Sequence, residues 1–226
     1  MKAIILAAGR GERMRPLTEK IPKSLLEVGG KPLIVSHIEK LAAAGFTQIV
    51  INHAHLGAQI EARLGAGARY GVNIVYSREA QALETAGGIA NALPLLDSAS
   101  FAAVNADVFS DYDYAELAAA VQRLASPGGV AHLVLVDNPD HNPDGDFALC
   151  GRQVALDGPR LTFSGIAAYR GEMFAAIARG HSAPLAPLLR GQIALQRVSG
   201  EHYRGRWRDV GTPERLAALN CELAVR

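Results

Sequence analysis

The chain has 226 residues, a length that suits one large domain or one domain with a small appendage. Hydrophobic residues make up 49% and charged residues 20%, which predicts a sizeable core. The net charge of +1 excludes a general attraction to nucleic acid or to a membrane surface, so any affinity for phosphate must come from a local cluster of cations. Only six apolar residues separate Lys2 from Gly9, and no stretch approaches the about 20 apolar residues of a membrane span, so we expect a cytoplasmic protein.

Short β-branched runs alternate with alanine- and leucine-rich stretches through the first part of the chain. Strands are expected at residues 3–7, 48–52, 73–76, 101–105 and 131–136, and helices at 32–44, 56–64, 88–95 and 114–124. This alternation predicts an α/β fold, a Rossmann-like and mostly parallel sheet flanked by helices. Ligands of such sheets bind in the loops that follow the strands.

The alternation stops after Val136. A polar loop with two prolines is followed by a β-hairpin expected at residues 147–150 and 153–156, a strand at 161–169, and helices at 173–178 and 184–189. Thr212 is expected to cap a final helix, with Pro213 in its first turn. We expect a single domain, residues 1–226, with a core at 1–136 and a second part at 137–226 that includes a small β-hairpin insertion.

The two cysteines, Cys150 and Cys221, lie far apart in the sequence and match no metal-ligand spacing. We therefore expect them to be core thiols of a protein from a reducing compartment.

The first 25 residues carry the strongest functional signal. A buried strand is followed by a loop with two glycines and three arginines, Ala8-Gly-Arg-Gly-Glu-Arg-Met-Arg15, and Lys23 lies just beyond it. A loop of this kind, rich in backbone N–H groups and cations, is suited to holding a polyphosphate. Position 14 is methionine, so the third glycine of a dinucleotide-binding loop is missing, and the spacing of a Walker A loop is absent as well.

Two aspartates are candidate ligands of Mg²⁺. Asp107 ends the buried run of residues 101–107 and faces the expected ligand edge, although a helix cap or a turn would also explain it. Asp209 precedes the turn Val-Gly-Thr212, which it could simply cap. Together, two carboxylates distant in the sequence could share one Mg²⁺.

A third element, residues 76–88, follows a strand and precedes a helix. Gly87 and Gly88 would permit close approach of a flat base, and Glu79 could accept a hydrogen bond from a ring N–H. An ordinary loop with a glycine at the helix entry explains the same residues equally well.

The pattern L-A-A-G-x-G-x-R-M-x-P-L-T-x-x-x-P-K-x-L at residues 6–25 resembles that of the sugar-1-phosphate nucleotidyltransferases. Asn105-Ala-Asp107, Thr162-Phe-Ser-Gly165 and Trp207-Arg-Asp-Val-Gly-Thr212 fit the same family in the same order, so the resemblance spans essentially the whole chain. Within the family the chain is similar to the short N-acetylmuramate α-1-phosphate uridylyltransferases of bacterial peptidoglycan recycling. The supporting segments include Leu83-Glu-Thr-Ala-Gly-Gly-Ile89 and Val198-Ser-Gly-Glu-His-Tyr-Arg-Gly205.

The resemblance implies transfer of UMP from UTP to N-acetylmuramate α-1-phosphate, giving the UDP-sugar and pyrophosphate, with Mg²⁺ as cofactor and a monomer or weak homo-oligomer. It assigns catalytic roles to Arg15, Lys23, Asp107 and Asp209, the last two as metal ligands. The nucleotide-binding residues that it implies are Ala8, Gly9, Arg10, Gly11, Glu12, Arg13, Lys23, Glu79, Leu83 and Gly88. The sugar phosphate is expected at Asn105, Asp146, Gly165 and Arg190. The resemblance thus implies a nucleotide-binding core at 1–136 and a sugar-phosphate-binding part with the C-terminal helix at 137–226.

The chain departs from the longer relatives in lacking a Glu-Lys-Pro segment whose lysine holds the sugar phosphate, which leaves Arg190, Arg204 and Arg206 as candidates. Serine follows Lys23 where proline is usual. The alternatives are a GTP-dependent mannose-1-phosphate guanylyltransferase, a transferase for another sugar phosphate, and a catalytically silent subunit that senses nucleotide sugars.

Overall fold

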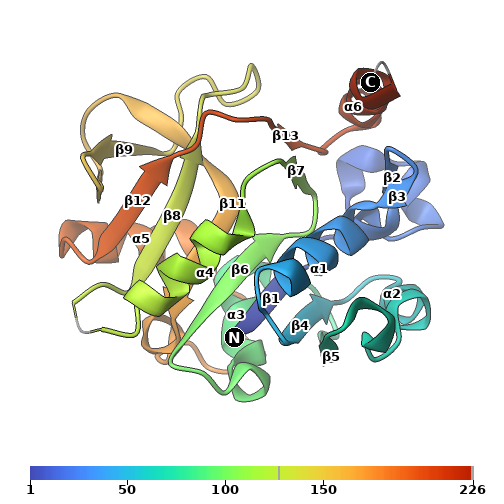
Figure 1. The fold of residues 1–226 in the computed structure, drawn as a ribbon, viewed down its shortest axis with the longest axis horizontal. Coiled ribbons are helices and arrows are strands. Elements are labelled where there is room, and N and C mark those ends of the chain that lie inside the picture. The colour runs from blue at the N-terminus through green and yellow to red at the C-terminus, as the bar shows by residue number, and fades with distance from the viewer. Residues whose placement is uncertain (127, 225–226) are drawn as a thin grey trace.

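The computed structural model describes residues 1–126 and 128–224, and a nine-stranded sheet forms its centre (Figure 1). The strands in spatial order are β5 (Asn73–Arg78), β4 (Gln48–His53), β1 (Lys2–Leu6), β6 (Ser100–Asn105), β11 (Arg160–Arg170), β8 (Ala131–Val136), β12 (Val198–His202), β10 (Gln153–Ala155) and β9 (Phe147–Cys150). The first four strands pair in parallel, β11 runs antiparallel to both β6 and β8, and β12 is parallel to β8. The predicted α/β fold with a mostly parallel sheet is confirmed.

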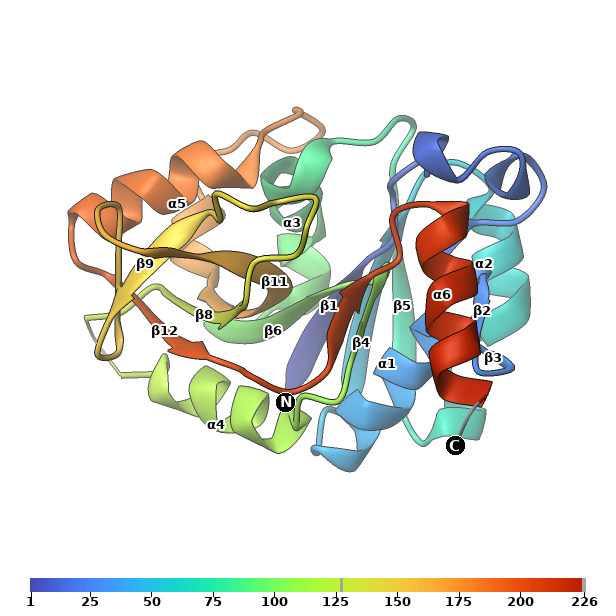
Figure 2. The ribbon, with the colours of Figure 1, turned by 90° about the horizontal axis from the view of Figure 1, so that it is seen from above.

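Helices cover both faces of the sheet, which makes three layers (Figure 2). The helices are α1 (Leu33–Ala43), α2 (Gly57–Leu64), α3 (Glu84–Leu96), α4 (Tyr114–Arg123), α5 (Leu185–Ala194) and α6 (Pro213–Ala224). Alternate strand residues serve the two faces: Ile5 packs with α1, α2 and α4, whereas Ile4 packs with α3 and α5. Residues of β1 are therefore apolar in succession, because both faces of a parallel strand are buried.

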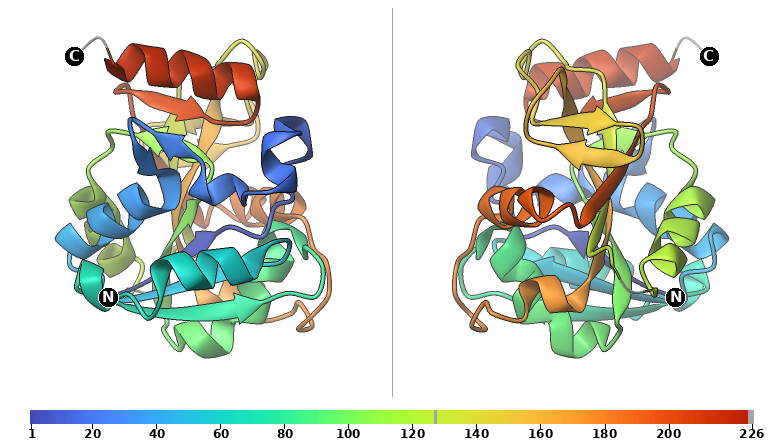
Figure 3. Two further views of the ribbon diagram at one scale, coloured as in Figure 1. Left: turned by 90° about the vertical axis from the view of Figure 1, so that its right-hand side faces the viewer. Right: turned by 90° about the vertical axis from the view of Figure 1, so that its left-hand side faces the viewer.

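Two small two-stranded sheets lie beside the large one. One joins β2 (Glu27–Val28) to β3 (Lys31–Pro32), and the other joins β7 (Val108–Ser110) to β13 (Trp207–Asp209). The C-terminal helix α6 docks on the first of them: Asn220 Oδ1 accepts a hydrogen bond from Gly29 N at 2.7 Å, and the views from the side show α6 beside this hairpin (Figure 3). Residues near both ends of the sequence thus share one cluster, built around Met14, Leu33 and Leu219.

Several expected elements differ in detail. The helix expected at residues 173–178 is a 3₁₀ turn, Gly171–Phe174, because Ala175 N bonds back only to Glu172 O and the chain then turns toward Gly180. Helix α3 begins four residues earlier than expected, and α5 continues to Ala194. The pairs β2–β3 and β7–β13 and the strand β12 are additional elements.

The cysteines are not core thiols. Cys150 and Cys221 are both exposed. Cys150 ends β9, the outermost strand of the large sheet, and Cys221 lies on the exposed side of α6, so neither position faces the core. Among the described residues, no helix combines the length and the apolar composition that crossing a bilayer requires.

Candidate active site

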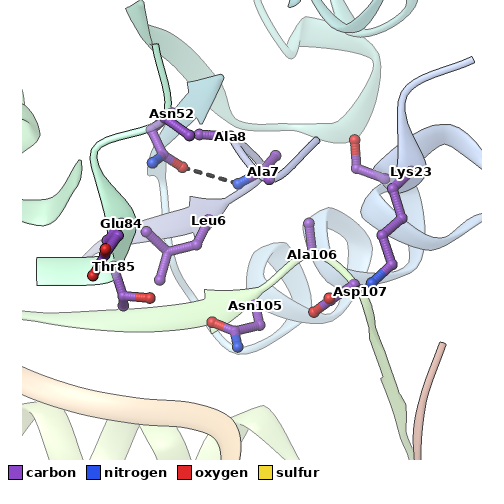
Figure 4. A pocket seen from close by; sticks show the side chains of 13 residues that line it. Leu6, Ala7, Ala8, Lys23, Asn52, Glu84, Thr85, Asn105, Ala106 and Asp107 are labelled. Carbon is purple, nitrogen blue, oxygen red and sulfur yellow. Dashed lines mark hydrogen bonds and ion pairs between the residues drawn. The ribbon is translucent and has the colours of Figure 1, made fainter. Parts of the chain in front are cut away.

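The carboxyl ends of β1, β4 and β6 meet at one edge of the sheet. Leu6 pairs in register with Asn52 on one side and with Asn105 on the other, so these three residues reach the edge together. A cavity of about 190 Å³ opens there. Its lining residues are Leu6, Ala7, Ala8, Gly9, Lys23, Ser24, Asn52, Ala82, Glu84, Thr85, Asn105, Ala106 and Asp107, most of which are labelled in Figure 4.

The loop after β1 owes its shape to Gly11. This glycine has φ +65°, and a Cβ there would lie 2.9 Å from Thr18 Cγ2. Thr18 Oγ1 donates a hydrogen bond to Gly11 O at 2.7 Å, and Met14 N donates to the same oxygen at 2.9 Å, so one carbonyl fixes the turn. A Cβ on Gly9 would meet nothing within 4 Å, which leaves the backbone beside the cavity open to a ligand.

The arginines of this loop lie at the surface rather than on the cavity wall. Arg10, Arg13 and Arg15 are exposed, and of the loop residues 8–15 only Ala8 and Gly9 line the cavity. Arg10 faces Glu12 at 4.0 Å, an exposed pair that holds neither side chain strongly. These arginines therefore follow the cavity-lining residues closely in the sequence, but their side chains do not line the cavity.

Asn52 connects the loop to the Glu79 segment. Its Oδ1 accepts a hydrogen bond from Ala7 N at 2.9 Å, drawn in Figure 4, and its Nδ2 donates to Glu79 Oε1 at 2.7 Å. Glu79 Oε2 accepts from Leu83 N at 3.0 Å. Burial raises the pKa of Glu79, while these hydrogen bonds oppose the rise. Both oxygens of Glu79, the expected base contact, thus already bind groups of the protein.

The glycines expected to make room for a base make room for the protein instead. A Cβ on Gly88 would lie 2.6 Å from Asn52 Nδ2, and one on Gly87 would lie 2.3 Å from His181 O. Leu83 is buried, and together with Glu79 it lines a separate cavity of about 250 Å³ on the far side of this segment.

Lys23 and Asp107 form an ion pair inside the main cavity. Lys23 Nζ lies 2.6 Å from Asp107 Oδ2, and the two side chains meet on one side of the cavity (Figure 4). The lysine side chain is 12% exposed and the aspartate 40%, so the ammonium is largely withdrawn from water while the carboxylate remains accessible. Ser24 Oγ is buried on the same wall and has no hydrogen-bond partner among the described residues.

Asp209 lies on the strand that pairs with the segment after Asp107. In the β7–β13 pair Asp209 stands opposite Val108, and Val210 N donates a hydrogen bond to Asp107 O at 2.9 Å. Asp209 Oδ2 lies 2.6 Å from Arg215 Nη1 and 3.1 Å from His141 Nε2. The topology thus brings together two acids that are distant in the sequence.

The donor set at these two acids fits a magnesium ion. Asp209 Oδ1 is buried and has no hydrogen-bond partner within the described ranges, as a carboxylate oxygen that binds a metal ion would. Mg²⁺ typically takes one or two carboxylates and completes its shell with water and phosphate oxygens. Across residues 1–126 and 128–224, no group of three or more metal-ligating side chains occurs.

A second cavity, of about 440 Å³, adjoins the first. It is lined by Glu84, Thr85, Asn105, Asp146, Phe147, Phe163, Pro184, Leu185, Ala186, Leu189 and Arg190. Its walls combine aromatic and aliphatic surface with two acids and one arginine, a composition suited to a sugar. Three of its residues, Glu84, Thr85 and Asn105, also line the first cavity.

The residues expected at the sugar phosphate have different roles in this second cavity. Asn105 lies on its wall, and Gly165, with φ +78°, lies behind Asn105, where a Cβ would come within 2.6 Å of Asn105 Nδ2. Asp146 Oδ2 accepts a hydrogen bond from Phe163 N at 2.8 Å and thereby holds the wall together. Arg190 is exposed at the end of the cavity that α5 forms.

The other two arginine candidates for the phosphate lie elsewhere. Arg206 pairs with Asp111 at 2.8 Å and stacks over Phe109, which uses its guanidinium within the protein. Arg204 lines a third cavity, of about 790 Å³, together with His141, Asp209 and Arg215.

Comparison with known proteins places the chain in a family. The nucleotidyl transferase family matches residues 2–145, and an N-acetylmuramate alpha-1-phosphate uridylyltransferase of Neisseria meningitidis serogroup B is 58% identical over 223 residues, covering 96% of this chain and 95% of that protein. A mannose-1-phosphate guanyltransferase of Schizosaccharomyces pombe is 44% identical over 122 residues, but the match covers only 34% of that protein. The chain belongs to the nucleotidyl transferase family, and the predicted class, a sugar-1-phosphate nucleotidyltransferase, is confirmed.

Solved structures agree with this fold. A putative glucose-1-phosphate thymidylyltransferase from Bacillus anthracis, crystallised with sucrose, superposes with a TM-score of 0.86 at 22% identity and covers 99% of this chain and 95% of its own. HddC from Yersinia pseudotuberculosis, complexed with GMP-PN, has a TM-score of 0.78 at 18% identity, with 98% of both chains covered.

The sequence analysis did not name Asn52 and Glu84, which line the candidate site, or His141 and Arg215, which contact Asp209 in the third cavity. Asn52 carried a usable signal, because a buried polar residue that ends a parallel strand faces the ligand edge. The other three gave no local signal, since their positions depend on contacts between distant segments.

Proposed function

We propose that this chain transfers the UMP group of UTP to N-acetylmuramate α-1-phosphate and releases pyrophosphate. The observation that carries the proposal is the 58% identity, over 96% of the chain, to a protein of that name. Two adjoining cavities support it, since one holds the Lys23–Asp107 pair and the other has walls suited to a sugar. We further propose a role in peptidoglycan recycling, a cytoplasmic location, and a monomer or weak homo-oligomer.

The chemistry requires positioning and charge neutralisation rather than a base. A phosphate monoester dianion is already a competent nucleophile, and its oxygen attacks the α-phosphorus in line while pyrophosphate leaves. Lys23, largely withdrawn from water, would neutralise the phosphates, since an ammonium acts more strongly at low local dielectric. The open backbone at Ala8 and Gly9 would donate to the nucleotide, and Asn105 to the sugar phosphate.

Asp107 and Asp209 would hold Mg²⁺. Bound there, the ion would supply positive charge to the phosphates in reaction. The exposed arginines Arg10, Arg13 and Arg15, together with the turn at Gly11 and Glu12, are assigned to the outer phosphates of UTP. On the base side of the site, we assign a supporting role to Glu79, Leu83 and Gly88, which act through Asn52. On the sugar side, we assign roles to Asp146, Gly165 and Arg190.

A matrix of substrates tests the proposal. Purified protein with Mg²⁺ is incubated with each of UTP, TTP, CTP and GTP against a panel of sugar 1-phosphates, and pyrophosphate release is measured. We expect the highest kcat/KM for UTP with N-acetylmuramate 1-phosphate. Preference for GTP with mannose 1-phosphate would replace the proposal with the guanylyltransferase alternative, and tight UTP binding without turnover of any pair would favour a sensing subunit.

A further inference from the structure

Glu84 lies where the two cavities of the candidate site meet. It lines both the 190 Å³ cavity that contains Lys23 and the 440 Å³ cavity beneath α5. In Figure 4 it stands beside Thr85, on the opposite side of the cavity from the Lys23–Asp107 pair. A sugar 1-phosphate in the second cavity would have to pass its phosphate toward the first at this point.

The backbone of Glu84 is in an unfavourable conformation. Its φ is +58°, in the left-handed region that glycine adopts freely and that residues with a Cβ disfavour. Of the described non-glycine residues, Leu56, Asp97 and Gln196 share this feature, and all three lie outside the two cavities. A strained residue at a ligand site suggests a functional reason for its side chain.

The neighbouring backbone holds Glu84 in this conformation from both sides. Before it, Leu83 N donates to Glu79 Oε2 at 3.0 Å, and Leu83 O accepts from Ala183 N at 3.0 Å. After it, Ala86 N and Gly87 N both donate to Ala183 O, at 3.0 and 3.1 Å. The segment at Ala183 thus clamps the start of α3, and the residue between the fixed points has no freedom to relax.

The carboxylate of Glu84 lies in the first turn of α3, where its charge suits the helix dipole, and it is otherwise unpaired among the described residues. Glu84 is exposed, and its side chain makes no hydrogen bond or ion pair with any residue that the structure describes. By contrast, Asp146 on the same cavity wall is occupied by Phe163 N. A carboxylate repels phosphate and accepts hydrogen bonds, so a hydroxyl or an amide N–H of a bound sugar is a suitable partner.

We propose that Glu84 selects the sugar: its carboxylate accepts a hydrogen bond from a ring hydroxyl or the acetamido N–H of the sugar 1-phosphate. A side chain is kept where glycine would fit the backbone better, because the carboxylate binds substrate. This inference rests on the proposed function and assigns a binding residue to its sugar cavity.

The test separates the carboxylate from the backbone strain. Glu84→Gly removes both, Glu84→Ala removes the carboxylate and keeps a Cβ, and Glu84→Gln keeps the size and removes the charge. Gln196→Gly is the matched control, because Gln196 has φ +56° and is exposed after α5, outside both cavities. Steady-state kinetics with each substrate varied in turn, and thermal unfolding, are measured for all four variants.

We expect the KM for N-acetylmuramate 1-phosphate to rise about tenfold or more in Glu84→Gly and Glu84→Ala, the loss of one hydrogen bond to a charged group. The KM for UTP should change less than about threefold, which corresponds to about half of the free energy of a tenfold change. The Tm of Glu84→Gly should equal or exceed that of the wild type, as should the Tm of Gln196→Gly, whose kinetics stay unchanged.

Unchanged sugar KM in Glu84→Gly would overturn the inference. A rise in the KM for UTP alone would overturn it as well, because the carboxylate would then bind the ribose. If the wild type uses another nucleotide and sugar phosphate, the proposed function fails and the same variants are measured on that pair. If it turns over no pair, calorimetric binding of N-acetylmuramate 1-phosphate in the presence of a non-hydrolysable UTP analogue decides: equal affinities of wild type and Glu84→Gly overturn the inference.

Discussion

The two cavities are built in different ways. The cavity beside Lys23 lies at the ends of β1, β4 and β6, three parallel strands whose register alone brings Leu6, Asn52 and Asn105 together. Apart from Glu84, Thr85 and Asn105, the cavity beneath α5 is assembled from antiparallel strands and a helix that come from residues 146–190. The first is therefore fixed by the core of the sheet, and the second depends on a few long-range contacts, so changes in the two should act differently.

The largest effect is expected at Lys23, on the wall of the first cavity. Lys23→Ala removes the ammonium that lies 2.6 Å from Asp107, and kcat/KM should fall at least about 100-fold, or about 3 kcal/mol of transition-state stabilisation. Stopped or continuous pyrophosphate assays measure it. Lys31→Ala, which breaks an exposed pair with Glu39, is the control and should leave turnover unchanged. Near-normal turnover in Lys23→Ala would remove this residue from the mechanism.

A change behind the second cavity should act on the sugar side. Gly165→Ala places a Cβ 2.6 Å from Asn105 Nδ2 at a φ of +78°, so we expect a stability loss of about 1–3 kcal/mol and a higher KM for the sugar phosphate. Gly191→Ala, in α5, meets nothing within 4 Å and should be neutral or stabilising. Urea unfolding and kinetics on both variants check this. A Gly165→Ala protein with normal stability and sugar KM would contradict the assigned role.

A third change tests the rigidity of the first cavity. Asn52→Ala removes the hydrogen bonds to Ala7 N and Glu79 Oε1, and the lost partners should cost about 1–3 kcal/mol of unfolding free energy. Urea denaturation measures it, with Asn73→Ala at the exposed start of β5 as the control. Equal midpoints for the two variants would mean that the network does not hold the loop.

The smallest expected effect, on stability, is at β5, the outer strand of the parallel half of the sheet. Hydrogen bonds from Arg78 lower the pKa of Glu61 to about 2, with a smaller contribution from His53. A carboxyl whose pKa is lowered on folding stabilises the protein above the unfolded value of 4.5, and that contribution is lost as the pH falls toward about 2. Between pH 5 and pH 2 the unfolding free energy of the wild type should therefore fall by about 1 kcal/mol more than that of Glu61→Gln, so its Tm should drop more steeply. Parallel Tm curves would exclude the contribution.

The parallel half could be predicted from the sequence because its signals are local. Buried runs such as residues 101–105 mark strands, and a polar residue directly after such a run, such as Asp107, lies at the ligand edge by topology alone. The motif around Gly11 and Lys23 is likewise contained in one short segment.

The second half could not be predicted to the same depth. Asp209 was found, but its partners Arg215 and His141 follow from the docking of α6 and the loop after β8. The left-handed backbone of Glu84 results from a clamp by Ala183, about 100 residues away, and nothing in the local sequence indicates it. The sequence also did not indicate that Cys150 and Cys221 are exposed.

The proposed mechanism depends most on a divalent ion held jointly by Asp107 and Asp209. The most direct measurement is an electron paramagnetic resonance titration of Mn²⁺, with a non-hydrolysable UTP analogue, into wild type, Asp107→Asn, Asp209→Asn and the control Asp111→Asn, whose carboxylate pairs with Arg206. We predict one tight site in the wild type and in the control, and Mn²⁺ binding at least about tenfold weaker in each of the other two variants. Wild-type affinity in Asp209→Asn would contradict the shared site.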